Sequence, residues 1–249
     1  MRYVLQILTI LAIFGLIVSG CKKDDAATNP TTVTHASGAY TGILAGAKTS
    51  DGSPVSGTLS LNIPSSKSAF GNENTMATFS VTGTYTVGGL ALTLHGTYRT
   101  DDDSLWVYNS DSTFRFRGTY NPSTGALSGI WTTPTSSGNF VAQTGSGTTV
   151  SLFLGTWNTN PVGTDGTFNM AVKGPAVLGV MATGAYKYPF TGTVSADDSI
   201  KIFASYSGFT MQIAKGKFTS AAHDSVNGTF NLSAIGKSAN GEWRAKKAN

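Results

Sequence analysis

Apolar side chains recur at every second position through most of this chain, and this spacing constrains the fold more than any other feature. Leu90, Leu92 and Leu94 alternate with Ala91, Thr93 and His95, and Phe114 and Phe116 flank Arg115. The same spacing recurs in Leu59, Leu61 and Ile63, in Phe168, Met170 and Val172, in Ile200 and Ile202, and in Phe209, Met211 and Ile213. A period of two predicts strands with one buried face and one solvent-exposed face. No window after residue 25 carries a helical stripe, so an all-β fold is expected.

Turn signals divide the first half of the chain into about eight strands. They are expected near residues 39–45, 55–63, 77–87, 90–99, 104–109, 112–120, 126–133 and 138–144. The composition agrees, because 30 glycines and a charged fraction of only 12% suit short strands joined by tight turns. Short loops make neighbouring strands antiparallel, and eight such strands hide their apolar face by closing into an up-and-down barrel. A Greek-key sandwich is the alternative fold.

The strand pattern occurs twice. Residues 96–131 and 192–230 share one order of strands and turns, including the turns Asp101-Asp102-Asp103-Ser104 and Asp197-Asp198-Ser199. The halves close alike, at residues 137–143 and 240–246, and open alike, at Gly38-Ala39-Tyr40 and Gly155-Thr156-Trp157. We therefore predict two tandem barrels, 38–144 and 153–247, joined by residues 145–152. A single membrane barrel of sixteen strands is disfavoured, because polar side chains dominate the outward faces where lipid requires an apolar band.

Residues 1–20 have the pattern of a signal peptide. One charge, Arg2, precedes an apolar stretch from Val4 to Val18, and the small residues Ser19 and Gly20 follow. The stretch is shorter than the roughly twenty residues that span a bilayer. Val18-Ser19-Gly20-Cys21 resembles the bacterial lipobox, which implies cleavage before Cys21 and lipid attachment to its sulfur. Two or more acyl chains hold a protein firmly on a membrane. Cys21 is the only cysteine, so no disulfide within the chain is expected.

Residues 21–37 are expected to form a lipidated, flexible tether. Lys22-Lys23-Asp24-Asp25 resembles the export tag of surface lipoproteins in the Bacteroidota, and a plain solvated tether is the alternative. The resemblance implies an outer-membrane lipoprotein, facing either the periplasm or the cell surface. Removal of residues 1–20 leaves 16 Lys and Arg against 13 Asp and Glu, a net charge of +3. The positive charges are scattered, so no nucleic-acid partner is expected.

Gly155-Thr156-Trp157 at the start of an antiparallel barrel resembles the first-strand signature of the calycins, which include lipocalins and avidins. The resemblance implies that Trp157 packs across one barrel end. It also implies that Arg244, beside Trp243, supplies the basic residue of the last strand that closes that end. In the first copy, Tyr40 occupies the position that corresponds to Trp157, so this copy lacks the signature Trp. A calycin-like barrel implies a binding scaffold, and the fold alone does not settle the function.

The sequence shows no constellation typical of catalysis or of metal binding. His35, His95 and His223 are expected to be solvated, and no metal-ligand spacing is present. The two Asp runs lack the ligand spacing of a calcium loop and are interpreted as turns, because Asp and Ser side chains bond nearby backbone amides. No serine elbow or pair of convergent carboxylates is apparent. We expect a non-catalytic protein without a cofactor or metal.

Trp106 and Tyr108 are large aromatic residues at positions where a barrel strand usually carries polar side chains. If Leu105 and Val107 face inward, Trp106 and Tyr108 face outward, and Lys201 and Phe203 match them in the second copy. Large aromatic side chains in water indicate a covering partner. Three interpretations remain open: packing against the sister barrel, binding of a glycan or protein, or a shifted phase that places these residues in the core.

Two functional hypotheses follow. The first is an anchored binding module for a small apolar ligand, a glycan or a protein partner. The second is a structural, interaction or protease-inhibitor-like envelope lipoprotein with filled barrels. The barrel interior separates them, because a ligand site needs a cavity of several hundred cubic ångströms.

Overall fold

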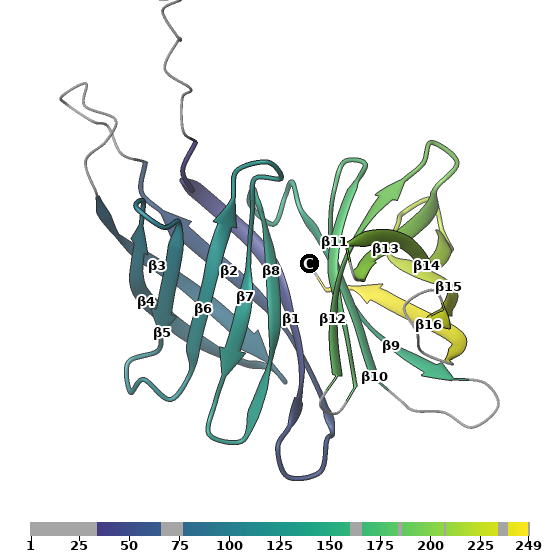
Figure 1. Ribbon diagram of the computed structural model, residues 1–249, viewed down its shortest axis with the longest axis horizontal. Coiled ribbons are helices and arrows are strands. Elements are labelled where there is room, and N and C mark those ends of the chain that lie inside the picture. Colours follow the sequence, from purple (N-terminus) through teal and green to yellow (C-terminus); the bar gives the residue numbers. More distant parts are fainter. Residues whose placement is uncertain are drawn as a thin grey trace, which may run out of the picture. The chain divides into compact units, whose positions relative to one another are not determined.

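The computed structural model describes residues 34–65, 77–159, 166–183, 186–206, 208–233 and 239–248. It contains two closed antiparallel barrels of eight strands each, which confirms the predicted all-β, up-and-down architecture. In barrel 1, strands β1 to β8 follow in sequence order and β8 pairs with β1. In barrel 2, β10 to β16 follow in order, and β9 pairs with both β16 and β10. Figure 1 shows barrel 1 in purple to teal and barrel 2 in green to yellow.

The strand bounds lie within a few residues of those predicted for barrel 1. Its strands are β1 (Gly38–Lys48), β2 (Pro54–Ile63), β3 (Thr78–Val87), β4 (Leu90–Arg99), β5 (Ser104–Tyr108), β6 (Arg115–Asn121), β7 (Ala126–Thr132) and β8 (Ser136–Thr144). Those of barrel 2 are β9 (Ser151–Thr159), β10 (Gly166–Lys173), β11 (Ala176–Thr183), β12 (Tyr186–Val194), β13 (Ser199–Tyr206), β14 (Phe209–Phe218), β15 (Ser225–Asn231) and β16 (Asn240–Lys247).

Aromatic side chains fill both barrels. In barrel 1, Phe116 packs edge-on against Tyr85 and Phe140, with ring centroids 5.8 and 5.7 Å apart. In barrel 2, the ring of Phe168 stacks on Trp243 at 4.3 Å and on Phe190 at 4.9 Å. All six side chains are at most 3% exposed. Eight-stranded barrels have interiors narrow enough for side chains to fill, and these two are filled.

Glycines at the inward positions of the strands make room for these rings. The motif apolar-x-Gly-x-aromatic recurs, for example as Phe116-x-Gly118-x-Tyr120 and Val226-x-Gly228-x-Phe230. A Cβ atom added at Gly216 would lie 2.5 Å from a ring carbon of Trp243, and one at Gly138 would lie 2.5 Å from Trp131 Nε1. Small barrels commonly alternate small and large inward residues to fit their taper.

Two residues that the alternation placed in the core lie at hairpin ends. Leu90 follows the Gly88-Gly89 turn and is 55% exposed, and Phe209 follows Gly208 and is 67% exposed. A β-bulge between β13 and β14 then inserts Ile213, so that Ile213 and Ala214 are both buried. A single bulge residue shifts the inward and outward parity of the remaining strand. Phe209 lies before the bulge, on the same side of β14 as Met211, which pairs with the buried Ala204. It is exposed because it lies at the hairpin end, so the prediction that Phe209 belongs to the core was wrong.

A third apolar cluster lies between the two barrels. It contains outward-facing residues of both: Ile43, Ala45, Val141, Val150, Leu152, Ala171, Val180 and Ala182. Asn169, fully buried, donates from Nδ2 to the Leu44 carbonyl at 2.8 Å and to Ser56 Oγ at 2.9 Å. Gln143 Nε2 donates to the Ala171 carbonyl at 2.7 Å. Residues Thr34–Asn249 thus form one compact unit, and the expected linker 145–152 is partly buried in it.

The strand register corrects the alignment of the two openings. Gly42 in β1 faces Ala142, and Gly155 in β9 faces Ala245. A Cβ atom at either glycine would meet that alanine's Cβ at 2.5 Å. Gly42 is therefore the counterpart of Gly155, four residues after the Gly38 that sequence comparison proposed. The conserved geometry lies in the pairing of β1 with β8 and of β9 with β16.

Candidate functional site

Trp106 and Tyr108 lie on the outer surface of barrel 1. Their neighbours Leu105 and Val107 are at most 1% exposed, whereas Trp106 is 46% and Tyr108 38% exposed. The prediction that Leu105 and Val107 face inward and Trp106 and Tyr108 face outward is therefore confirmed, and the two aromatic residues do not belong to the core. Their exposure also means that the sister barrel does not cover them. Their exposure excludes two of the three interpretations, packing against the sister barrel and a shifted phase; binding of a glycan or protein stays a prediction.

The neighbouring strands add arginines and an isoleucine to these aromatic side chains. The strand register places His95, Tyr108 and Arg115 in one outward row across β4, β5 and β6. The next row contains Trp106, Arg117 and Ile130 across β5, β6 and β7. Outward side chains in direct cross-strand register are close enough to contact one another. We call these six residues, His95, Trp106, Tyr108, Arg115, Arg117 and Ile130, the Arg–aromatic face.

Side chains of the Arg–aromatic face contact one another through their rings. The Arg117 guanidinium carbon lies 3.9 Å from the centroid of the Trp106 ring, and the rings of His95 and Tyr108 meet edge-on at 4.4 Å. An exposed cation–π contact of this kind is worth roughly 0.5–1 kcal/mol. Arg115 Nε donates to the Ser112 carbonyl at 2.9 Å. The ion pairs within the described residues do not include Arg115 or Arg117, so the face is electropositive.

The sequence analysis named only the aromatic members of this face. Arg115 and Arg117 flank Phe116. Because alternate residues of a strand face opposite sides, an inward Phe116 places both arginines on the outer surface. The contact between Arg117 and Trp106 depends on the register of β5 with β6, which composition and spacing do not provide.

Phe203 is placed differently from the other predicted binding residues. Its side chain is half-buried and lines a pocket of about 310 Å³ together with Val141 of barrel 1 and with Leu178 and Tyr188 of barrel 2. This pocket lies between the outward faces of the two barrels. Phe203 therefore lies in the pocket between the barrels, and Trp106 and Tyr108 lie on the exposed outer surface of barrel 1.

Trp157 and Trp243 are paired across β9 and β16 inside barrel 2, where both are buried. Trp157 Nε1 donates to the Ala182 carbonyl at 3.3 Å, and its ring meets Phe230 edge-on at 5.2 Å. Arg244 pairs with Thr156 on the outward, exposed side of the same strands. The structure therefore brings the two tryptophans together and places Arg244 on the opposite side of the sheet.

The two aspartate runs form equivalent turns. Asp102 and Asp197 each accept the backbone N–H of the serine two residues later, at 3.1 and 3.3 Å. Hydrogen bonds from Ser104 and Ser199 lower the pKa of these two carboxyl groups. The following residues, Asp103 and Asp198, adopt φ values of 54° and 64°. Both runs are thus turn-forming segments, as the sequence analysis interpreted them.

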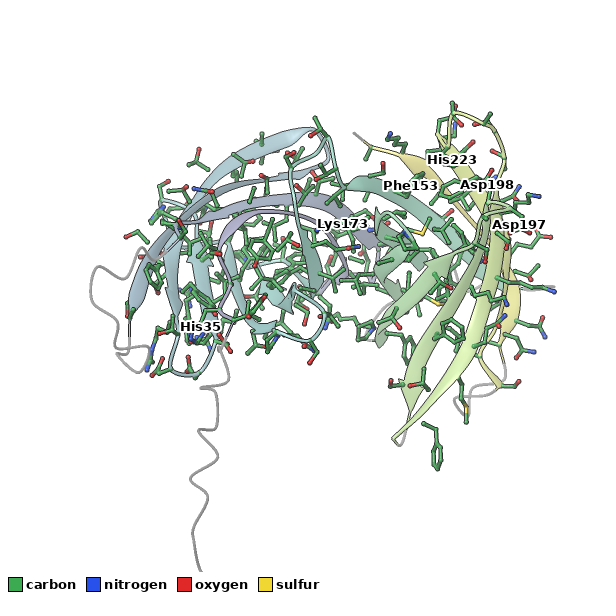
Figure 2. The ribbon with its side chains drawn as sticks, turned by 90° about the horizontal axis from the view of Figure 1, so that it is seen from above. His35, Phe153, Lys173, Asp197, Asp198 and His223 are labelled. Atoms are coloured by element: carbon green, nitrogen blue, oxygen red, sulfur yellow. The ribbon has the colours of Figure 1, made fainter. Side chains whose placement is uncertain are left out.

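Each turn also holds a histidine. His35 Nδ1 lies 2.9 Å from Asp103 Oδ1, and His223 Nε2 lies 3.0 Å from Asp198 Oδ1. Figure 2 shows His223 and Asp198 together at one end of barrel 2. Tyr98 donates its hydroxyl proton to Asp103 and accepts the N–H of the buried Ala36 at 3.0 Å. The end of the predicted tether is therefore packed on barrel 1, and the expectation of a freely solvated His35 was wrong.

Within the described ranges, no group of three or more His, Cys, Asp or Glu side chains is arranged to hold a metal ion. No helix in the same ranges has the length and apolar character to cross a membrane. Cys21, the signal peptide and the tether up to residue 33 lie outside the described residues.

No protein family, curated protein or solved structure matches this chain.

Proposed function

We propose that this chain is a lipid-anchored envelope protein that binds a protein partner through the outer surface of barrel 1. The filling of both barrels by aromatic side chains carries this proposal. Phe116, Phe140 and Phe168 occupy the space where a small apolar ligand would sit, and all three are at most 2% exposed. Binding is therefore assigned to the outside of the barrels, in agreement with the hypothesis of a filled, interacting lipoprotein.

The anchor is inferred from the lipobox-like residues Val18-Ser19-Gly20-Cys21. Acylation of Cys21 at the end of a tether would hold the barrels at the surface of the outer membrane. Ala36 packs on barrel 1, and residues 22–33 separate Cys21 from the first described residue, Thr34. A tether of this kind keeps the module close to partners in the same membrane layer.

The partner is assigned as a protein because the Arg–aromatic face has the composition of an interface centre. Trp, Tyr and Arg are enriched among residues that dominate binding energy, and Ile130, 51% exposed, adds apolar area beside them. Two hollows of the described surface, of about 980 and 310 Å³, lie away from this face, and small-molecule sites are concave. Because no carboxylate of the described residues forms an ion pair with Arg115 or Arg117, the complementary surface is expected to be acidic.

Site-specific photo-cross-linking in the native envelope tests this assignment. A photoreactive residue at Thr97, which is paired with Trp106, should give a discrete adduct, and one at the exposed Ser60 of β2 should not. The double variant Trp106→Ala/Arg117→Ala should lose the Thr97 adduct. Phe209→Ala, which removes an even more exposed aromatic side chain from barrel 2, should keep it. The absence of an adduct at Thr97, or one that survives the double variant, contradicts the proposal.

A further inference from the structure

The outer surface of barrel 2 carries a groove that runs across its strands. One part, of about 980 Å³, is lined by residues of β15, β16 and β9 together with Gly166, and by Pro54 of barrel 1. A second part, of about 390 Å³, is lined by residues of β13, β14 and β15. The two parts share Asn227, Gly228 and Thr229, so they form one continuous channel.

The strand register explains the course of the channel. Its floor is a single row of paired residues at inward positions of the strands: Ile200, Gly216, Gly228, Trp243, Trp157 and Gly166. This row crosses β13, β14, β15, β16, β9 and β10 in succession. With neighbouring strands about 4.8 Å apart, the channel is about 24 Å long. Its walls are the outward side chains on either side of the row.

The walls are polar, and most of their charged residues are cations. One wall carries Ser199, Lys217, Asn227, Arg244 and Thr156, and the other carries Lys201, Lys215, Thr229, Glu242 and Asn158. Four cations thus face one carboxylate. The ion pairs found within the described residues involve none of them. The turn carboxylates Asp197 and Asp224 accept hydrogen bonds from Ser199 and from Ser220. The hydrogen bonds from Ser199 lower the pKa of Asp197, and the charge of Lys217 lowers it further.

We propose that this channel binds an extended acidic polysaccharide, a chain of uronic acid sugars. The cations complement regularly spaced carboxylates, and the Thr, Ser and Asn side chains between them match sugar hydroxyl groups. Binding at this site is separate from, and does not depend on, the protein partner proposed for barrel 1.

Other linear anions fit the channel less well. An extended acidic peptide would need unpaired backbone groups for strand addition, and every strand of the floor is paired on both sides in a closed barrel. Single-stranded nucleic acid would need aromatic stacking platforms, and Leu90, Trp106, Tyr108, Ile130 and Phe209, the exposed large apolar residues of the described surface, all lie outside the walls. A protein interface would need the same kind of apolar anchor.

Calorimetric titration of the purified, full-length mature protein in detergent tests the proposal. The probe is an oligogalacturonate long enough to span the channel, and a neutral galactan oligomer of the same length is its control. We expect saturable binding of the acidic oligomer alone, weakened by added salt. Lys215→Ser/Arg244→Ser should weaken it about tenfold, because two exposed charged contacts are lost.

The matched control variant is Lys48→Ser/Arg99→Ser, which removes two positive charges from the surface of barrel 1 and should bind as the wild type does. All altered side chains are exposed, and melting curves verify that both variants fold. Undetectable binding of oligogalacturonate, equal weakening by the two double variants, or equally tight binding of polyglutamate or single-stranded DNA would each overturn the proposal.

Discussion

Replacement of Phe168 by Ala tests the filled interior of barrel 2. The Phe168 side chain is 0% exposed, and its ring stacks on Trp243 at an interplanar angle of 15° and on Phe190 at 28°. Truncation of a buried Phe to Ala typically costs about 3–5 kcal/mol. The loss of two ring contacts, each worth roughly 0.5–1.5 kcal/mol, places the expected cost in the upper part of that range. This corresponds to a fall in Tm of roughly 8–20 °C.

Urea unfolding followed by tryptophan fluorescence measures the cost, because Trp157 and Trp243 report on barrel 2. Phe209→Ala is the matched control. It makes the same chemical change at a side chain that is 67% exposed, and it should alter the free energy of unfolding by no more than about 0.5 kcal/mol. A dry cavity should also form in Phe168→Ala, so benzene should stabilise this variant and leave the wild type unchanged.

Two results would refute this reasoning. If Phe168→Ala costs less than about 1 kcal/mol, the ring is not packed on both sides as the structure shows. If benzene stabilises the wild type to the same extent as the variant, the interior already contains a ligand cavity, and an internal site for an apolar molecule returns as the better function.

Three further predictions concern the anchor, the tyrosines and the contact between barrels. Cys21→Ser should release the protein from membranes without unfolding it, and a variant that still sediments with membranes in high salt would contradict lipidation. Burial raises the pKa of Tyr40 and of Tyr85 to about 12, so their contribution to stability is complete below pH 10 and is lost as the pH rises toward 12. Phenolate absorbance should therefore rise in two stages, the later one together with unfolding; a single stage near pH 10 in a folded protein would be inconsistent with buried rings. Asn169→Ala removes two donors to barrel 1 and should cost about 1–3 kcal/mol by calorimetry, while the exposed Asn62→Ala should cost little; equal melting curves for the two variants would argue against the buried contact.

The barrels were predictable from sequence because their determinants are local. Alternation in stretches such as Leu90 to Leu94 sets which face is buried, and glycine turns set where each strand ends. Short loops then leave few ways to pair the strands. The positions of Leu105 and Val107 gave the correct phase for Trp106 and Tyr108 by the same logic.

Features that depend on distant parts of the chain were not predictable in this way. Ile43 and Val141 are outward-facing apolar residues whose role becomes apparent only when the second barrel covers them. Asn169 has the polar character of a solvated position, yet it is buried because Leu44 and Ser56 accept its hydrogen bonds. The bulge at Ile213 changes parity by one residue without a signal in composition.

The proposed sites depended on register in the same way. The cation–π contact of Arg117 with Trp106 joins neighbours across two strands, and the channel on barrel 2 joins residues of six strands in one row. Spacing along the sequence places each residue on a face, and only the register of paired strands places it beside its partners.

A crystal of the mature protein under xenon pressure tests the central claim most directly, because xenon enters dry apolar cavities. We expect continuous side-chain density through both barrels and no xenon atom among Phe116, Phe140, Phe168 and Trp243. Xenon bound inside either barrel, or density for an apolar ligand there, would contradict this claim and would return the binding site to the interior.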